Sequence, residues 1–212
     1  MSAVNLVWAT PKGDELVAYM ARVSNPSNQN NTATAPKLVK YLVDNKHWSP
    51  LDMVDMCVEI TTTRDIARQI LRHRSFYFQE FSQRYADPTE DLGFRLRDAR
   101  LQDKKNRQNS IETSDYEMKV EWIEHQQAVV AQSSKAYKWA IENGVAKEQA
   151  RAVLPEGLTL SRMYMKGTLR NWIHYVDVRT DVSTQKEHRL IAEECKKHMF
   201  ECFPSMKELY GN

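Results

Sequence analysis

With 212 residues the chain is long enough for a substantial hydrophobic core, and we expect one domain over residues 1–212. Its 30 basic and 28 acidic residues leave a formal net charge of +2, which excludes a global positive field as the basis of anion or nucleic-acid binding. No apolar run is long enough to cross a bilayer and no secretory signal pattern precedes the first charged helix, so we expect a cytoplasmic protein without membrane contact.

Strands and helices alternate in the first third of the chain. Apolar and polar residues alternate strictly before Thr62, as in a half-buried strand, and a threonine there is a suitable cap for a helix beginning near Arg64. The predicted elements before that helix are a strand at residues 4–9, helices at 14–22 and 36–43, and a strand at 54–61.

The rest of the chain is mostly helical. Residues 88–110 are charge-rich and weakly patterned, and they predict a solvated excursion. The predicted elements after it are a long helix at 114–142, a short helix at 147–154, a strand at 158–166, and helices at 169–178 and 182–203. The residues of the long helix that we expect to be buried are Trp122, Val129, Val130 and Tyr137. Those of the last helix are Leu190, Ile191, Cys195, Met199 and Phe203. These patterns predict an α+β fold in a single domain, with a small, mainly antiparallel sheet flanked by several helices including one long helix.

The segment from Arg72 to Tyr85 concentrates groups suited to binding anions. It begins with Arg72-His73-Arg74 at the C-terminal end of a predicted helix, where cations are electrostatically favoured even without a function. Arginine forks can also bind several phosphates at once. Seven residues separate this run from Ser82, and Gln83-Arg84-Tyr85 follows directly. This spacing resembles the signature of the flavin-dependent thymidylate synthases.

Four further segments resemble that family in the same order along the chain. Residues 21–24 (Ala-Arg-Val-Ser) and 47–52 (His-Trp-Ser-Pro-Leu-Asp) are similar to two of its N-terminal segments. Residues 150–155 (Ala-Arg-Ala-Val-Leu-Pro) and 168–179 are similar to two C-terminal ones. Against the family pattern the chain has these departures: Lys46, Asp52, Met53, Gln79 and Thr168.

The resemblance implies an enzyme that methylates dUMP to dTMP. The carbon donor would be 5,10-methylenetetrahydrofolate, the hydride source FAD reduced by NADPH, and the second product tetrahydrofolate. The family also implies a homotetramer whose active sites are shared between subunits. Arg179 matches the arginine that the family uses against the uracil ring, so it is the expected catalytic residue.

The resemblance also implies the binding residues. For FAD they are Ser49, Arg72, His73, Arg74, Glu80, Thr168, Arg170 and His174. For dUMP they are Gln69, Arg72, Glu80, Phe81, Ser82, Gln83, Arg84, Arg151 and Arg179. No glycine-rich dinucleotide fingerprint is present, so arginines and backbone amides would have to hold the phosphates.

Other readings of single residues are weaker. Ser82 lacks the G-x-S-x-G context of a hydrolase nucleophile, and Cys57 lies in a predicted strand without a basic neighbour, so we expect it to be structural. His125, His188 and His198 lie outside any motif and are expected on the surface or in packing. No residue set has metal-ligand spacing, so no metal is expected.

Two alternative functions remain open at this point. One is a nucleic-acid-binding module that uses the signature and the arginines of residues 95–107, although acids interrupt that run. The other is a flavin-binding relative that oxidises NADPH without methylating a nucleotide. Binding of dUMP would separate this second alternative from a synthase.

Overall fold

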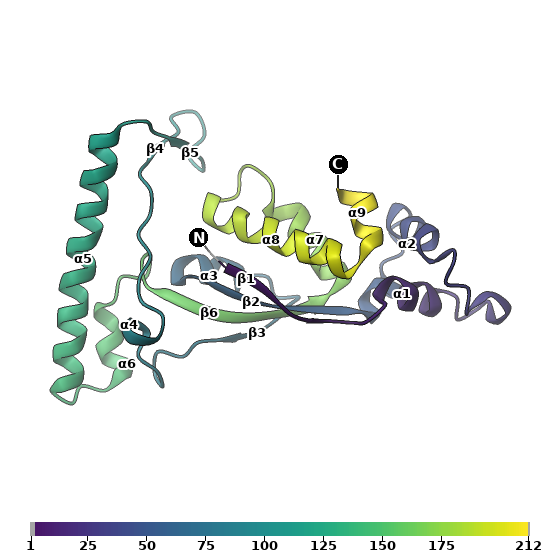
Figure 1. The fold of residues 1–212 in the computed structure, drawn as a ribbon, viewed down its shortest axis with the longest axis horizontal. Coiled ribbons are helices and arrows are strands. Elements are labelled where there is room, and N and C mark those ends of the chain that lie inside the picture. The colour runs from purple at the N-terminus through teal and green to yellow at the C-terminus, as the bar shows by residue number, and fades with distance from the viewer. Residues whose placement is uncertain (1–2, 212) are drawn as a thin grey trace.

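The computed structural model describes residues 3–211, and its centre is a four-stranded antiparallel sheet (Figure 1). The strands, in their spatial order, are β1 (Ala3–Ala9), β2 (Asp55–Thr63), β6 (Leu160–Thr168) and β3 (Tyr77–Glu80). β2 and β6 pair over nine residues each, from Asp55 opposite Thr168 to Thr63 opposite Leu160. The predicted α+β class with an antiparallel sheet is confirmed. The sequence did not predict β3, a strand of four residues within the signature.

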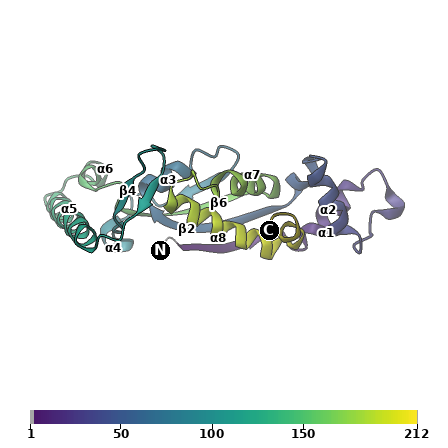
Figure 2. The same ribbon diagram turned by 90° about the horizontal axis from the view of Figure 1, so that it is seen from above.

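Helices cover one face of this sheet. α7 (Leu169–Arg179) and α8 (Lys186–Cys202) lie next to each other across it, with α3 (Arg64–Ile70) nearby (Figures 1 and 2). Trp172 of α7 is fully buried, and its indole N–H donates to the carbonyl oxygen of Met56 at 3.0 Å. Gly167 is required here, because a Cβ at this position would lie 2.5 Å from the ring of Phe76. The main core therefore lies between this face and α7, α8 and α3.

No helix of the described chain covers the opposite face of the sheet (Figure 1). Polar cross-strand pairs occupy this face: Lys166 forms a 2.6 Å ion pair with Asp55, and the Tyr164 hydroxyl donates to Glu59 at 2.9 Å. Along β6 the burial alternates, with Met163 and Met165 inside and Tyr164 42% exposed. This alternation is the period-two pattern of a sheet with one solvated face.

The two ends of the sheet carry different groups of helices (Figures 1 and 2). At one end are α1 (Gly13–Ala21), α2 (Ala35–Asp44) and α9 (Pro204–Tyr210). At the other are α4 (Pro88–Asp91), α5 (Tyr116–Glu142) and α6 (Lys147–Ala150). α5 is the predicted long helix, and it ends as expected at Asn143, before Gly144 with a φ of 74°. The sequence did not predict α9.

The prediction of which α5 residues are buried is wrong for most of them. Tyr137 is buried, whereas Trp122 is 43% and Val129 50% exposed, and Val130 is half-buried. The residues of α5 that face the body are instead Gln126, Ser133, Tyr137 and Ala140. α5 stands beyond the end of the sheet (Figure 1), and within residues 3–211 its apolar stripe is buried only around Tyr137, which packs in a cluster with Ala150.

Three smaller predictions need correction. Thr63 precedes α3, but its hydroxyl donates to the Asp65 carboxylate at 2.6 Å instead of capping the helix. The last long helix begins at Lys186, because Asp181 accepts hydrogen bonds from Ser183 and stabilises a turn before it. Leu190, expected in the core, is 44% exposed on the outer side of α8, while Ile191, Cys195, Met199 and Phe203 are buried as predicted.

The charged segment 88–110 is more ordered than a solvated excursion. Its strand β4 (Arg100–Gln102) pairs with β5 (Ser110–Glu112) in a hairpin, and Arg97 forms a 2.6 Å ion pair with Asp65. The Gln126 side-chain amide forms two hydrogen bonds with the backbone of Arg97. Its oxygen accepts from the Arg97 N–H at 2.8 Å, and its nitrogen donates to the Arg97 carbonyl oxygen at 2.9 Å. Arg97 and Arg100 are engaged in ion pairs inside the chain, which argues against their use in a nucleic-acid surface. Within residues 3–211 no helix is both long and apolar enough to span a membrane.

Candidate active site

The first group of predicted site residues surrounds a hollow of about 550 Å³ at the N-terminal half of α7, which we call the α7 hollow. Arg170 and His174 project from this helix, and Ser75 comes from the signature. The Asn171 amide donates to the Ser75 carbonyl oxygen at 2.8 Å and so fixes the end of the Arg72-His73-Arg74 run against α7. The lining residues are Trp48, Ser75, Arg170, Asn171, Ile173, His174 and Asp177.

Asp52 holds the entrance to α7. Its carboxylate accepts from the Thr168 hydroxyl at 2.9 Å and from Arg170 Nη1 at 3.1 Å. Asp52 lies in the 3₁₀ turn Ser49–Met53, which places the predicted Ser49 close to the start of α7. Asp52 and Thr168 both depart from the family pattern, and the structure shows that they contact each other. At these two positions of the chain a carboxylate is therefore paired with a hydroxyl.

The second group, the His73 network, lies at the C-terminal end of α7. Arg179 donates from Nε to His73 Nε2 at 2.8 Å, so that nitrogen of His73 must be unprotonated. The His73 ring packs edge-on against Tyr175, with ring centroids 4.9 Å apart. Arg72 is exposed, whereas His73 is half-buried. The three residues of the run therefore do not all project outward as cations.

Burial and nearby cations explain the state of His73. Desolvation lowers its pKa to about 4, and the charges of Arg179, His174 and Arg72 add to this effect. His73 is therefore neutral at pH 7 and acts as a hydrogen-bond acceptor for Arg179. Because Nε of Arg179 is used for this contact, its two terminal amino groups remain to bind a ligand.

The third group, the Glu80 cluster, surrounds the last residue of β3. Glu80 accepts a 2.7 Å hydrogen bond from the Ser161 hydroxyl and lies 3.5 Å from Arg64 Nη1. Gln83 is buried, and its amide nitrogen has no hydrogen-bond partner in the structure. A buried donor without a partner is costly, so it marks a place where a ligand or another chain is expected.

A cationic hollow of about 290 Å³ adjoins the Glu80 cluster. Arg64, Arg68 and Arg151 line it together with Gln83. Arg84, the signature arginine, forms a 3.5 Å ion pair with Glu148, whose carbonyl oxygen accepts from Arg151. This pairing brings together two predicted residues that are 67 positions apart. Phe81 and Ser82 lie half-buried beside them.

Sequence reasoning missed several residues of these groups. Arg64 and Arg68 lie four residues apart on α3, a spacing that puts them on one helix face and was available as a signal. His188, expected on the surface or in packing, is fully buried and contacts Gln69 and Tyr175. No sequence signal marks it.

The surroundings of two aromatic residues of the signature and of the three cysteines are also clear. Phe76 is buried against Trp172, with ring centroids 4.8 Å apart, while Tyr77 is 72% exposed. Cys57 does have a basic neighbour, Lys166, but burial outweighs it and raises the pKa of the thiol. All three cysteines are unpaired thiols. Among residues 3–211 no three His, Cys, Asp or Glu side chains gather as a metal site would need.

Comparison with known proteins identifies the chemistry that these groups serve. The family model "Thymidylate synthase complementing protein" (Thy1) matches residues 5–205. The chain belongs to the Thy1 family.

Relatives in this family are flavin-dependent thymidylate synthases. The chain is 49% identical over 193 residues to a probable flavin-dependent thymidylate synthase of Paramecium bursaria Chlorella virus 1, covering 91% of this chain and 88% of the relative. It is also 49% identical over 197 residues to the flavin-dependent thymidylate synthase of Synechocystis sp., covering 93% and 88%. This Thy1 protein is thus a flavin-dependent thymidylate synthase, as the signature predicted.

A solved structure shows the same fold. The UMP/dUMP methylase PolB from Streptomyces cacaoi, bound with 5-Br dUMP, aligns with a TM-score of 0.85 over 100% of this chain and 95% of its own, at 25% identity. The Thy1 assignment and this similarity agree on the fold.

Proposed function

We propose that this enzyme methylates dUMP to dTMP with 5,10-methylenetetrahydrofolate as carbon donor and NADPH-reduced FAD as hydride source, releasing tetrahydrofolate. The observation that carries the proposal is the pairing of Arg179 with neutral His73 at 2.8 Å. This contact holds the guanidinium by one edge and leaves the other edge for a pyrimidine ring. A fixed positive charge there stabilises negative charge on the ring, which activates its carbon as a nucleophile. Arg179 is therefore our candidate catalytic residue.

The α7 hollow has the size and chemistry for part of a flavin. It offers the flat indole of Trp48, the amide of Asn171, and the cationic or polar groups of Arg170 and His174. FAD, when bound, supplies the hydride that completes the methyl group. The remaining proposed FAD-binding residues are Ser49, Arg72, His73, Arg74, Glu80 and Thr168.

The nucleotide is proposed to bind between the other two groups. The Glu80 cluster offers arginines and the unpartnered Gln83 amide, which suit a phosphate. Its proposed dUMP-binding residues are Glu80, Phe81, Ser82, Gln83, Arg84 and Arg151. The His73 network offers Gln69, Arg72 and Arg179 for the base.

We propose a homotetramer with active sites shared between subunits. Two features of the described residues 3–211 support it: much of the apolar stripe of α5 is uncovered, with Trp122 43% and Val129 50% exposed, and no helix lies on one face of the sheet (Figure 1). Large uncovered apolar areas mark contacts between chains. We also propose that residues 1–212 act as one domain and that the enzyme is cytoplasmic, where its three thiols stay reduced.

The test combines a spectrum with product analysis. Purified protein should show a flavin absorption spectrum that shifts when dUMP is added, and it should form dTMP from dUMP, methylenetetrahydrofolate and NADPH. Arg179→Ala should keep the flavin but lose most of the turnover. A colourless protein that takes up no FAD and makes no dTMP overturns the proposal. A protein that oxidises NADPH but neither binds nor methylates dUMP supports the oxidase alternative instead.

A further inference from the structure

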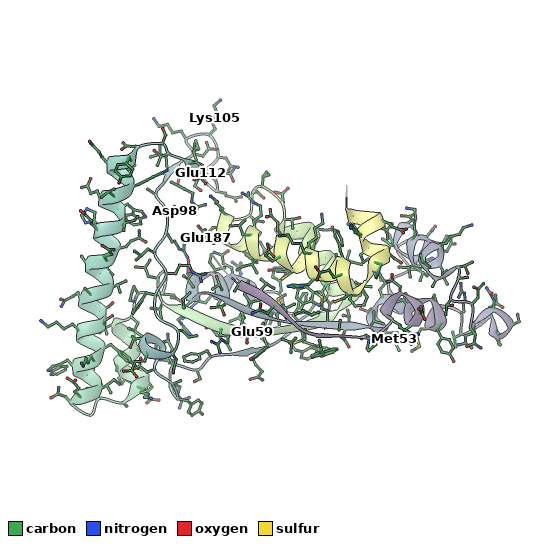
Figure 3. The ribbon with its side chains drawn as sticks, in the orientation of Figure 1. Met53, Glu59, Asp98, Lys105, Glu112 and Glu187 are labelled. Atoms are coloured by element: carbon green, nitrogen blue, oxygen red, sulfur yellow. The ribbon has the colours of Figure 1, made fainter. Side chains whose placement is uncertain are left out.

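Gln69 is one member of a continuous chain of polar side chains that joins β4, α8, α3 and α7. At one end, Arg100 of β4 forms an ion pair with Glu187 of α8. Gln185 donates from Nε2 to Glu187 Oε2 at 3.0 Å, and Gln69 donates from Nε2 to Gln185 Oε1 at 2.8 Å. Figure 3 labels Glu187 at the end of α8 that faces the β4–β5 hairpin.

The charged end fixes the orientation of both amides. A guanidinium can only donate and an ionised carboxylate can only accept, so Glu187 accepts from Arg100 and also from Gln185. Gln185 must then turn its NH₂ group toward Glu187, which leaves its oxygen facing Gln69. Gln69 in turn presents its NH₂ group to Gln185. An amide flip at either glutamine would place two donors or two acceptors face to face.

The other end of the chain is consistent with this orientation. His188 Nδ1 lies 3.3 Å from Gln69 Oε1, and His188 Nε2 lies 3.1 Å from the Tyr175 hydroxyl. His188 is fully buried, and desolvation together with the charge of Arg179 lowers its pKa to about 3, so the ring is neutral. Burial raises the pKa of Tyr175 well above its usual value, so its hydroxyl stays protonated and can donate. Because the charged end turns Gln69 Oε1 toward His188, the ring carries its proton on Nδ1 and donates it to Gln69, and Nε2 accepts from the Tyr175 hydroxyl.

The position of Gln69 puts it close to Arg179. The rings of His188 and His73 lie 6.3 Å apart, and His73 accepts the hydrogen bond from Arg179. Gln69 is therefore part of the group proposed above to face the base and not of the Glu80 cluster. With one amide hydrogen on Gln185 and the oxygen on His188, the second amide hydrogen of Gln69 remains for a ligand.

We propose that Gln185 and His188 are positioning residues that lock the Gln69 amide as a donor, so that the enzyme selects uracil over cytosine nucleotides. This inference rests on the proposed binding of dUMP next to Gln69. The O4 carbonyl oxygen of uracil accepts the fixed N–H, whereas the 4-amino group of cytosine meets it with another donor. An amide free to flip would accept either edge. A site that leaves a polar group unpaired against the wrong substrate discriminates strongly.

The experiment measures dissociation constants of dUMP and dCMP for the FAD-loaded enzyme by titration calorimetry. Gln185→Leu removes the acceptor for Gln69 at a half-buried position. We expect the preference for dUMP over dCMP to fall at least about tenfold, because one ordered hydrogen bond is lost. The control is Gln102→Leu, since that amide donates only to carbonyl oxygens of its own hairpin. The Gln102→Leu enzyme should prefer dUMP over dCMP as strongly as the unmodified enzyme does.

Variants at His188 provide a rescue test. His188→Leu should reduce the preference in the same way, whereas His188→Asn keeps an N–H donor near the position of Nδ1 and should restore most of it. A purely structural role would lower the melting temperature of both variants without changing the dUMP:dCMP ratio. If Gln185→Leu leaves the ratio of the dUMP and dCMP dissociation constants unchanged, the inference is overturned. If the unmodified FAD-loaded enzyme binds no dUMP, the proposed function fails instead.

Discussion

Glu80 gives the sharpest test of the electrostatics of the site. Its carboxylate accepts from the Ser161 hydroxyl at 2.7 Å and lies 3.5 Å from Arg64 Nη1. The side chains of Arg64 and Glu80 are only 16% and 23% exposed. Burial lowers the pKa of Arg64, and the charge of Glu80 opposes this shift. Glu80→Gln keeps the shape and an acceptor for Ser161 but removes the charge that Arg64 faces.

The expected loss of unfolding free energy follows from the burial of the Glu80–Arg64 pair. Removing one partner of a fully buried ion pair costs about 3–5 kcal/mol, and an exposed pair contributes about 0.2–1 kcal/mol. The Glu80–Arg64 pair is mostly buried but makes a single long contact, so we expect Glu80→Gln to lower the free energy of unfolding by about 2 kcal/mol. Glu80→Leu also leaves the buried Ser161 hydroxyl without its acceptor, and we expect about 3 kcal/mol.

The assay is denaturant unfolding of FAD-free protein at pH 7 and a fixed protomer concentration, since assembly would otherwise change the apparent stability. The matched control is Glu156→Gln, which removes an identical charge from Arg68. In that pair the side chains are 64% and 45% exposed, so we expect a loss of less than about 1 kcal/mol. Equal losses in Glu80→Gln and Glu156→Gln would show that burial does not set the cost and would refute the reasoning.

Three further predictions test other parts of the site. Asp52→Ala should weaken FAD affinity about three- to tenfold, measured by fluorescence titration, because Arg170 loses its 3.1 Å partner; an unchanged affinity contradicts this role. The pKa of His73 is lowered to about 4, so the unfolded chain binds the proton more readily, and stability should fall as pH drops from about 6.5 toward 4. His188, whose pKa is lowered to about 3, contributes to the same fall, so His73→Asn should reduce the slope in pH-dependent unfolding without abolishing it; an unaltered slope would exclude His73 as a source. Trp172→Phe removes the buried donor to the Met56 carbonyl oxygen and should cost about 2–4 kcal/mol in urea unfolding; a loss below 1 kcal/mol would be inconsistent with that burial.

The sequence predicted elements well where the local pattern and the tertiary environment agree. The alternation before Thr62 gave β2, and helical spacing gave α7 and α8 because these helices bury one side on the sheet. Prediction failed where the environment differs from the pattern. The stripe of α5 is apolar, but among residues 3–211 only the part around Tyr137 is buried, and Trp122 remains 43% exposed. The four-residue β3 is too short for a periodic signal, and its pairing with β6 defines it.

The sequence by itself determined the family, because the signature and four other segments keep their order along the chain. Only the tertiary structure decided which of these residues meet. Pairing of β2 with β6 puts Asp55 opposite Thr168 and so brings Asp52 to Thr168 and Arg170. Packing of α8 against α3 then brings His188 to Gln69 across 119 positions. Such contacts depend on how distant elements close on each other, and a linear pattern carries no record of that closure.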